Sequence, residues 1–331
     1  MQSVRRSLVC FTLVLCLAAS ATSFAGSGGG DPESIGASSP AAHKNLWQIR
    51  LADGNWVETH GPDSAVAVDS LAHDLAGRVP RGSDRSAVNC VSSSSSHFGA
   101  IYARAQDDVD RSVLMVPLLR QSIYDASAFL DSDARNASAG ARARLNVLCD
   151  SSSDIQVAVE TLPISAEDAD VTSIIDALQA KGYSHPRAKY IVFWDECVQL
   201  CEFGGQGTIR DDDRASADNA NNSGTSYAID YADLLVDGPA WPTILHEVGH
   251  TMGAVQLSAP NTSGAFHCND GVDVMCYDDN GSSSDYSETA CPLMRFDCSS
   301  DDYFSPSPSA GSYLATHWNL AAAYNSYIDH D

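Results

Sequence analysis

The chain has 331 residues, 44% of them hydrophobic, and a formal net charge of −24. This length exceeds one average domain but also suits a single catalytic domain that follows a leader. A strongly anionic surface repels nucleic acid and anionic lipid, so the composition argues against a nucleic-acid-binding protein and against stable membrane association.

The first 25 residues have the pattern of a secretory signal peptide. Arg5 and Arg6 precede an apolar run over residues 8–19, and a small-x-small site follows at residues 23–25. The apolar run is about a dozen residues long, whereas a membrane-spanning helix needs about 20. We therefore expect residues 1–25 to be removed and the mature protein to be secreted into an extracellular, oxidising compartment.

Residues 26–89 are predicted to form a flexible spacer that ends in a small β-hairpin. Residues 26–42 are mostly Gly, Ser, Pro and Ala and offer little to bury. Residues 46–51 and 55–58 then alternate in polarity around the turn dipeptide Asp53-Gly54, which is a hairpin pattern. The hairpin is predicted to be either an accessory strand pair or part of a pro-segment.

Residues 90–331 alternate between strand-like and helix-like stretches, which predicts an α+β domain with a mixed, twisted sheet. The candidate strands cover residues 100–103, 145–148, 155–159 and 190–194. The candidate helices cover residues 116–130 with Pro117 in the first turn, 171–181 with Gly182 just past the end, and 313–324 at the C-terminus.

The cysteines outside the predicted leader are even in number, which in an exported chain favours disulfides. A structural zinc knot is disfavoured because paired C-x-x-C spacing is absent from the sequence. Short spacing suggests Cys197 with Cys201, Cys268 with Cys276 and Cys291 with Cys298, which leaves Cys90 to pair with Cys149.

An H-E-x-x-H pattern at residues 246–250 indicates a metal site. On a helix with 3.6 residues per turn, His246 and His250 project from the same face, so both imidazoles can reach one ion. Glu247 lies beside them and can take a proton from a water. Neutral imidazole suits zinc, and Pro242 fits near the start of such a helix.

The residues that follow resemble the metzincin zinc peptidases. Gly253 stands three residues after His250, and Met275 and Tyr277 form a Met-x-Tyr segment similar to the metzincin Met-turn. The resemblance covers about a tenth of the chain. It implies a metzincin-like catalytic domain with a zinc-site helix, a Met-turn and a C-terminal helix, and it implies that Tyr277 lies near the metal to stabilise an oxyanion.

The third metal ligand departs from the metzincin pattern. Metzincins place His or Asp three residues after the glycine, but this chain has Gln256 there, and a neutral amide oxygen is a poor zinc ligand. His267, next to Cys268, is the better candidate. Asp270, Asp273 and an unfilled position stay open as alternatives.

Two groups of oxygen-bearing side chains could bind Ca²⁺, although a solvated acidic loop is the favoured interpretation of both. The first Ca²⁺ group is Asp211, Asp212, Asp213, Asp218, Asn219, Asn221 and Asn222, and the second is Asp270, Asp278, Asp279 and Asn280.

The glycine-rich stretch at residues 204–207 is predicted to form a cleft edge over which an extended peptide adds a strand.

The sequence thus predicts a secreted, zinc-dependent endopeptidase acting on protein or peptide substrates, with Glu247 as general base. Two other functions stay open. One is a non-catalytic secreted binding protein on a metallopeptidase scaffold, and the other is a zinc hydrolase of another amide bond.

Overall fold

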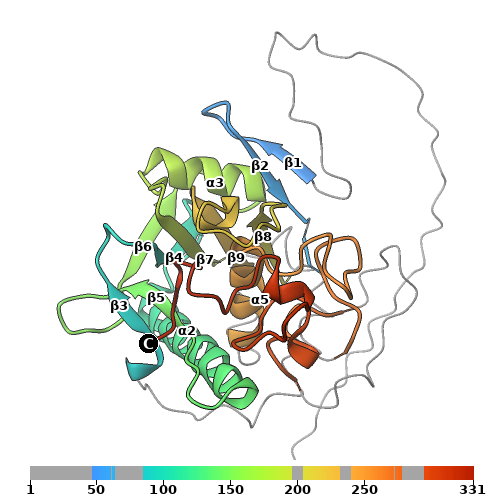
Figure 1. The fold of residues 1–331 in the computed structure, drawn as a ribbon. Helices are drawn as coiled ribbons and strands as arrows, with labels where there is room; N and C mark the ends of the chain where they lie inside the picture. The colour runs from blue at the N-terminus through green and yellow to red at the C-terminus, as the bar shows by residue number, and fades with distance from the viewer. Residues whose placement is uncertain are drawn as a thin grey trace, which may run out of the picture. The chain divides into compact units, whose positions relative to one another are not determined.

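The computed structural model describes residues 47–60, 62–63, 85–195, 204–231, 240–271, 273–277 and 294–331. All of them lie in the unit Ser39–Asp331, whose centre is a ten-stranded mixed sheet (Figure 1). The predicted leader and spacer lie outside the described residues. The strands are β1 (Trp47–Arg50), β2 (Trp56–Thr59), β3 (Asn89–Val91), β4 (His97–Ala105), β5 (Arg144–Leu148), β6 (Val157–Leu162), β7 (Ala188–Trp194), β8 (Gly205–Ile209), β9 (Ser226–Tyr231) and β10 (Ile328–Asp329).

The strands in the middle of the sheet are parallel and those toward its edges are antiparallel. The order is β1-β2-β8-β9-β7-β4-β5-β10, with β3 paired to β5 and β6 paired to β4. β4 runs parallel to β5, β6 and β7, and β7 runs parallel to β9. β8 is antiparallel to β9, and β2 is antiparallel to β8. The α+β class with a mixed sheet is therefore as predicted, and all four predicted strands overlap β4, β5, β6 or β7.

Helices cover the two faces of the sheet unequally (Figure 1). Helices α2 (Ser112–Ala137) and α5 (Trp241–Thr251) share one apolar cluster with Phe98, Ala100 and Tyr102 of β4. Helix α3 (Val171–Ala180) packs on the other face, where Ile101 and Ala103 point. This alternation along β4 is the two-residue period of a strand that is covered on both sides.

Helix α3 agrees with its prediction, whereas α2 is longer than predicted. Asp170 caps α3 through the amide of Ser173, and Gly182 follows its end with φ +95°. Helix α2 begins at Ser112, so Pro117 lies inside the helix and not in its first turn. The earlier start is anchored by Arg111, whose guanidinium pairs with the buried Asp195 at the end of β7.

The predicted C-terminal helix over residues 313–324 is wrong. Only a 3₁₀ turn, η4 (Tyr313–Ala315), forms there. The amide of Trp318 donates to the carbonyl of Asp213 at 2.7 Å, and the amide of Leu320 donates to that of Tyr303 at 2.9 Å. The side-chain oxygen of Asn319 accepts from the Ser305 amide at 3.0 Å. The amides of Trp318 and Leu320, which in a helix would donate to carbonyls one turn earlier, thus donate to other segments of the chain.

The predicted hairpin and two of the predicted disulfides are present. β1 and β2 pair antiparallel around Gly54, which has φ +86°. Cys197, Cys201 and Cys291 lie outside the described residues, so their predicted pairs are untested. The disulfides that the structure shows are Cys90–Cys149 and Cys268–Cys276.

Among the described residues, every helix is too short or too polar to span a bilayer.

Candidate metal centre

Helix α5 brings the two histidines of the H-E-x-x-H pattern together. It begins at Trp241 with Pro242 in its first turn, and all of its residues are buried. The Nε2 atoms of His246 and His250 lie 3.0 Å apart. The imidazoles therefore converge on one point, as their spacing of one helical turn predicts.

The orientation of each imidazole leaves a nitrogen lone pair at this point. Nδ1 of His246 lies 2.5 Å from the carbonyl oxygen of Val274, which can only accept, so Nδ1 donates this bond and Nε2 is the nitrogen that faces the centre. Burial, together with the nearby His60 and His246, lowers the pKa of His250 well below its ordinary value. His250 is therefore neutral, which is the form that binds metal.

Gly253 lies in the turn that follows α5, and Met275 lies against α5 itself. Gly253 has φ +81°, and a Cβ added there would lie 2.3 Å from the side chain of Asn221, so the turn after α5 requires glycine. A Cβ added to Gly249 would lie 2.6 Å from the sulfur of Met275. The methionine thus packs directly against the helix that carries the histidines.

His267 lies at the same centre. Its ring stacks on that of His246 with centroids 5.3 Å apart and meets the ring of His250 edge-on at 5.0 Å. Its Nε2 atom is 3.4 Å from a carboxylate oxygen of Asp63. The structure therefore brings together the three histidines that the sequence singles out.

Gln256 does not face this centre. Its side-chain oxygen accepts from the amide of Asp212 at 2.7 Å, and its side-chain nitrogen donates to the carbonyls of Arg210 and Gly253. These three contacts hold the amide against the backbone of two loops. Gln256 thus has a structural role in joining the loops.

Tyr277 borders the centre. Its ring centroid is 4.4 Å from that of His267 and 5.9 Å from that of His246. Its hydroxyl donates a hydrogen bond to the carboxylate of Asp63. The tyrosine is therefore within reach of the group that occupies the space between the imidazoles.

Two residues of the site, His60 and Asp63, were not singled out in the sequence. The ring of His60 stacks on that of His250 at 3.7 Å, and its Nε2 atom accepts from the amide of Gly207 at 3.1 Å. A carboxylate oxygen of Asp63 lies 2.9 Å from Nε2 of His246. Both residues follow the hairpin, far from α5 in sequence, and no motif marks them.

Glu247 is fully buried beside the imidazoles. Neither of its carboxylate oxygens has a hydrogen-bond partner among the described residues. Burial and the carboxylates of Asp63 and Asp230 raise its pKa well above the ordinary value. A Cβ on Gly205 of β8 would lie 2.3 Å from Glu247, so glycine allows this strand to approach the helix closely.

The donor set fits a divalent cation. Nε2 of His246 lies 2.9 Å from one carboxylate oxygen of Asp63, and Nε2 of His267 lies 3.4 Å from the other, so imidazole and carboxylate ligand atoms converge at the centre. One group of ligand atoms within 4.8 Å of one another comes from His60, Asp63, His250 and His267, and another comes from Asp63, His246 and Glu247. Imidazole and carboxylate together suit zinc.

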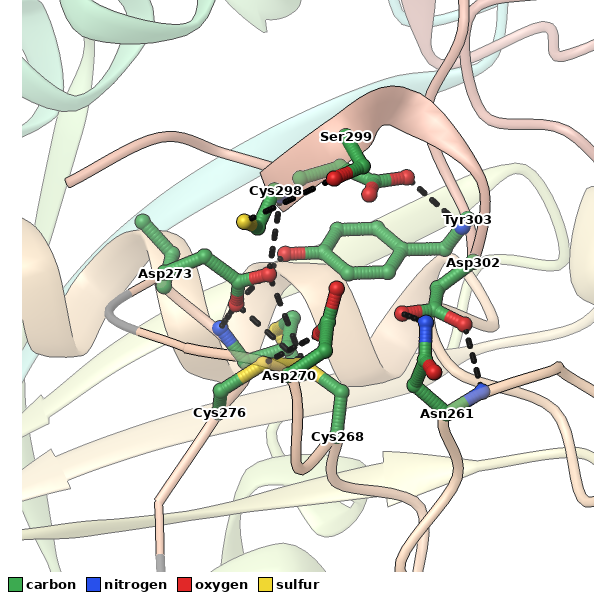
Figure 2. Close-up of a disulfide and its surroundings, with 12 residues drawn as sticks. Asn261, Cys268, Asp270, Asp273, Cys276, Cys298, Ser299, Asp302 and Tyr303 are labelled. Atoms are coloured by element: carbon green, nitrogen blue, oxygen red, sulfur yellow. Dashed lines mark hydrogen bonds between the residues drawn. A yellow bond between two sulfur atoms is a disulfide. The ribbon is translucent and has the colours of Figure 1, made fainter. Parts of the chain in front are cut away.

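A disulfide-bonded turn, drawn with its surroundings in Figure 2, adjoins the centre in sequence. The Cys268–Cys276 bridge joins the residue after His267 to the residue after Met275. The buried carboxylate of Asp273 accepts from the amides of Met275 and Cys298 and from the hydroxyl of Tyr303, at 2.7, 3.1 and 3.0 Å. These bonds fix the turn whose carbonyl orients His246.

A buried lysine supports the other end of α5. Nζ of Lys189 donates to the carbonyl of Thr251, the last residue of the helix, at 2.5 Å and lies 4.5 Å from the ring centroid of Tyr327. Lys189 is 1% exposed, and burial lowers its pKa well below the ordinary value. It satisfies a carbonyl that the helix itself leaves open.

The two predicted Ca²⁺ groups differ in the structure. In the first group, the carboxylate of Asp212 pairs with Arg214 and accepts from the amide of Ala220, so it binds its own loop. In the second, Asp278, Asp279 and Asn280 lie outside the described residues. Asp270 instead lies with Asp301 and Asp302, which offer oxygens within 4.8 Å of one another.

No family model and no curated protein matches the chain. Similar solved structures include wild-type OgpA from Akkermansia muciniphila in two crystal forms, with TM-scores of 0.30 and 0.35, identities of 11% and 12%, and coverage of 51% and 67% of this chain and 50% and 64% of that chain. Catalytically inactive OgpA in complex with an O-glycopeptide substrate gives a TM-score of 0.31 and 11% identity over 51% of this chain and 50% of that chain. The chain thus spans half to two-thirds of the length of these proteins.

Proposed function

We propose that this protein is a secreted zinc endopeptidase of the metzincin kind. The observation that carries the proposal is the meeting of three imidazoles, from His246, His250 and His267, beside the buried carboxylate of Glu247. His267 is favoured over Gln256 as third ligand because the Gln256 amide is engaged with backbone groups. Zinc held there would supply Lewis acidity toward the scissile carbonyl.

The chain's own residues would then carry the proton and stabilise charge. Glu247 takes a proton from the attacking water and returns it to the leaving amine, a role that its buried position beside the imidazoles allows. Tyr277 donates a hydrogen bond toward the developing oxyanion, since its hydroxyl already reaches the space between the imidazoles.

The side of β8 that β2 covers would suit a peptide as substrate once that pairing is released. β8 lies against α5 at Gly205 and Gly207, where an added Cβ would approach Glu247 or His250 within 2.3 and 2.8 Å. A chain that adds to this edge therefore passes close to the general base. Edge addition recognises backbone amides and carbonyls, which peptides present whatever their sequence.

Substitution of Glu247 tests the proposal. Glu247→Gln should keep one zinc per chain and lose peptide hydrolysis, because the amide cannot accept the proton. The matched control is Glu160→Gln on β6, whose carboxylate pairs with Lys181 away from the centre and should leave turnover unchanged. Peptide cleavage by the Glu247→Gln protein at the wild-type rate would overturn the assignment.

One observation favours a second function, a non-catalytic secreted binding protein. The carboxylate of Asp63 lies in the space between the imidazoles, where a water and a scissile carbonyl would have to enter. If Asp63 stays there permanently, the protein would bind zinc without cleaving peptides. Zinc content measured together with turnover on a peptide library separates the two functions.

A further inference from the structure

A cavity of about 410 Å³ lies at the end of the sheet where strands β4, β7 and β9 begin. Three of the residues that line it, Ser96, Arg187 and Gly224, stand one or two residues before these strands. None of its lining residues is acidic and none belongs to the candidate metal centre. In a chain with a net charge of −24, a cavity wall that holds an arginine and no carboxylate differs from the average surface.

Arg187 brings a positive charge to this wall. Among the described residues its guanidinium bonds only to the carbonyl of Ser94, at 3.2 Å. Arg85, which is also exposed, instead pairs with the carboxylate of Asp154 at 3.3 Å. A guanidinium has five N–H donors, so Arg187 keeps most of its donors for a ligand.

A second guanidinium lies behind the wall. A Cβ added to Gly224 would lie 2.8 Å from Nη2 of Arg210, so glycine lets this side chain approach closely. Burial raises the pKa of Tyr327 to about 12, and the hydroxyl of Ser96 opposes this shift. The guanidinium groups of Arg210 and Arg187 also lower that pKa, so two positive charges lie near one phenol.

Neutral groups complete the lining. The hydroxyl of Ser96 accepts from that of Ser326 at 2.9 Å, so its own hydrogen can be donated elsewhere. Guanidinium groups bind phosphate and carboxylate oxygens with paired hydrogen bonds. A tetrahedral oxyanion presents acceptors in several directions, which suits donors that come from separate segments, whereas a carboxylate presents them in one plane.

We propose that this cavity binds a sulfate or phosphate group, with Arg187 as the charged contact and Ser96 as a hydroxyl donor. The site goes beyond the proposed peptidase activity and does not depend on it. The volume leaves room for an organic molecule that carries the group, and Pro186 and Tyr324 also line the cavity.

The test measures binding of inorganic sulfate and phosphate to the full chain by calorimetry, with chloride added to hold the ionic strength constant. Wild type should bind one ion per chain. Arg187→Gln should weaken binding by about 10-fold or more, because a hydrogen bond between charged groups is lost. The matched control is Arg85→Gln, which removes the same charge from an arginine that pairs with Asp154 and should bind as wild type.

Two further ligands identify the source of the group. Tighter binding of phosphoserine or of a sulfated monosaccharide than of the inorganic ions would support a group carried by a larger molecule, and equal binding would support a free ion. Ser96→Ala is a second variant that leaves both arginines in place, and it should weaken binding by about 3-fold or more. Equal sulfate and phosphate affinity in wild type and Arg187→Gln, or a wild type that binds neither ion, would overturn the proposal.

Discussion

Nδ1 of His246 is hydrogen-bonded to the carbonyl oxygen of Val274, so the helix that carries the first imidazole is tied to the turn that carries Met275. The bond selects the tautomer of His246 whose Nε2 can bind metal. Because the carboxylate of Asp273 holds this turn through three donors, the geometry of the metal centre depends on a residue that does not face it.

Removal of the Asp273 carboxylate should therefore weaken zinc binding. Asp273→Ala leaves the amides of Met275 and Cys298 and the Tyr303 hydroxyl without their acceptor, and we expect zinc affinity to fall about 10- to 100-fold. The free energy of unfolding should fall by about 2 to 4 kcal/mol. Competition with a chromophoric chelator measures the affinity, and urea unfolding measures the stability.

The control for this variant is Asp297→Ala. Asp297 is equally buried and accepts from the amides of Tyr303 and Phe304, but it makes no bond to the Met275 turn. It should lose similar stability and keep wild-type zinc affinity. Equal zinc affinity in the two variants would contradict the positioning role of Asp273.

A pair of substitutions should identify the third ligand. His267→Ala should reduce zinc affinity by at least about 100-fold, because it removes a donor atom from the centre. Gln256→Ala should leave zinc affinity unchanged and lower the free energy of unfolding by about 1 to 3 kcal/mol, because three backbone groups lose their partner. Metal analysis after dialysis distinguishes the two, and the reverse pattern would make Gln256 the ligand.

Loss of the Cys90–Cys149 disulfide should cost more stability, whereas loss of the Cys268–Cys276 disulfide should cost more zinc affinity. Cys90–Cys149 closes a sequence separation of 59 residues and Cys268–Cys276 one of 8. Loop entropy alone gives losses of about 4 and about 2.5 kcal/mol when each pair is replaced by serine. Only the shorter bridge adjoins His267 and Met275, so only its loss should lower zinc affinity, by about 10-fold or more. Denaturation and chelator competition on both double variants check this.

Stability should fall as pH rises toward neutrality because of Asp302. Burial, opposed by the amide of Asn261 but aided by Asp270, raises the pKa of Asp302 from 3.8 to about 7. The folded chain therefore binds a proton that the unfolded chain has released between about pH 4 and pH 7, and its free energy of unfolding decreases across that window.

Asp302→Asn should flatten this pH dependence by about 1 to 4 kcal/mol between pH 4.5 and pH 7.5, since one pKa unit equals about 1.4 kcal/mol. Urea denaturation at the two pH values gives the comparison. The control is Asp168→Asn. Asp168 is exposed and lies just before helix α3, so this variant should keep the wild-type dependence of stability on pH. An unchanged slope in Asp302→Asn would rule out this carboxyl as the source.

The parts of the fold and site that the sequence predicts are those set by local patterns. The spacing of His246 and His250, the glycine at Gly253 and the Asp53-Gly54 turn each determine their own local geometry, and each has that geometry in the structure. The C-terminal stretch fails for the opposite reason. Its backbone bonds to Asp213 and Tyr303, which no pattern within residues 313–324 can reveal.

Asp63 and His60 show the same limit at the site. Each is one polar residue in an unremarkable stretch, and their approach to α5 depends on strand β2 adding to β8. The prediction for residues 204–207 was an edge that receives a peptide, whereas the ladder with β2 lies at Thr208 and Ile209 and Asp63 contacts Gly204 and Gly205. The sequence could not show that the chain itself would pair with β8, because strand pairing between distant segments depends on the whole sheet.

The buried side chain of Lys189 links the last residues of the chain to helix α5, which carries His246 and His250. Tyr327 covers the Lys189 amine, and β10, at Ile328–Asp329, holds the tyrosine in place by pairing with β5. Trimming the chain before Tyr327 would hydrate Lys189 and release the last turn of α5, on which His250 sits. The final residues are thus unsuited to deletion or to a tightly fused tag, and an affinity handle there needs a spacer.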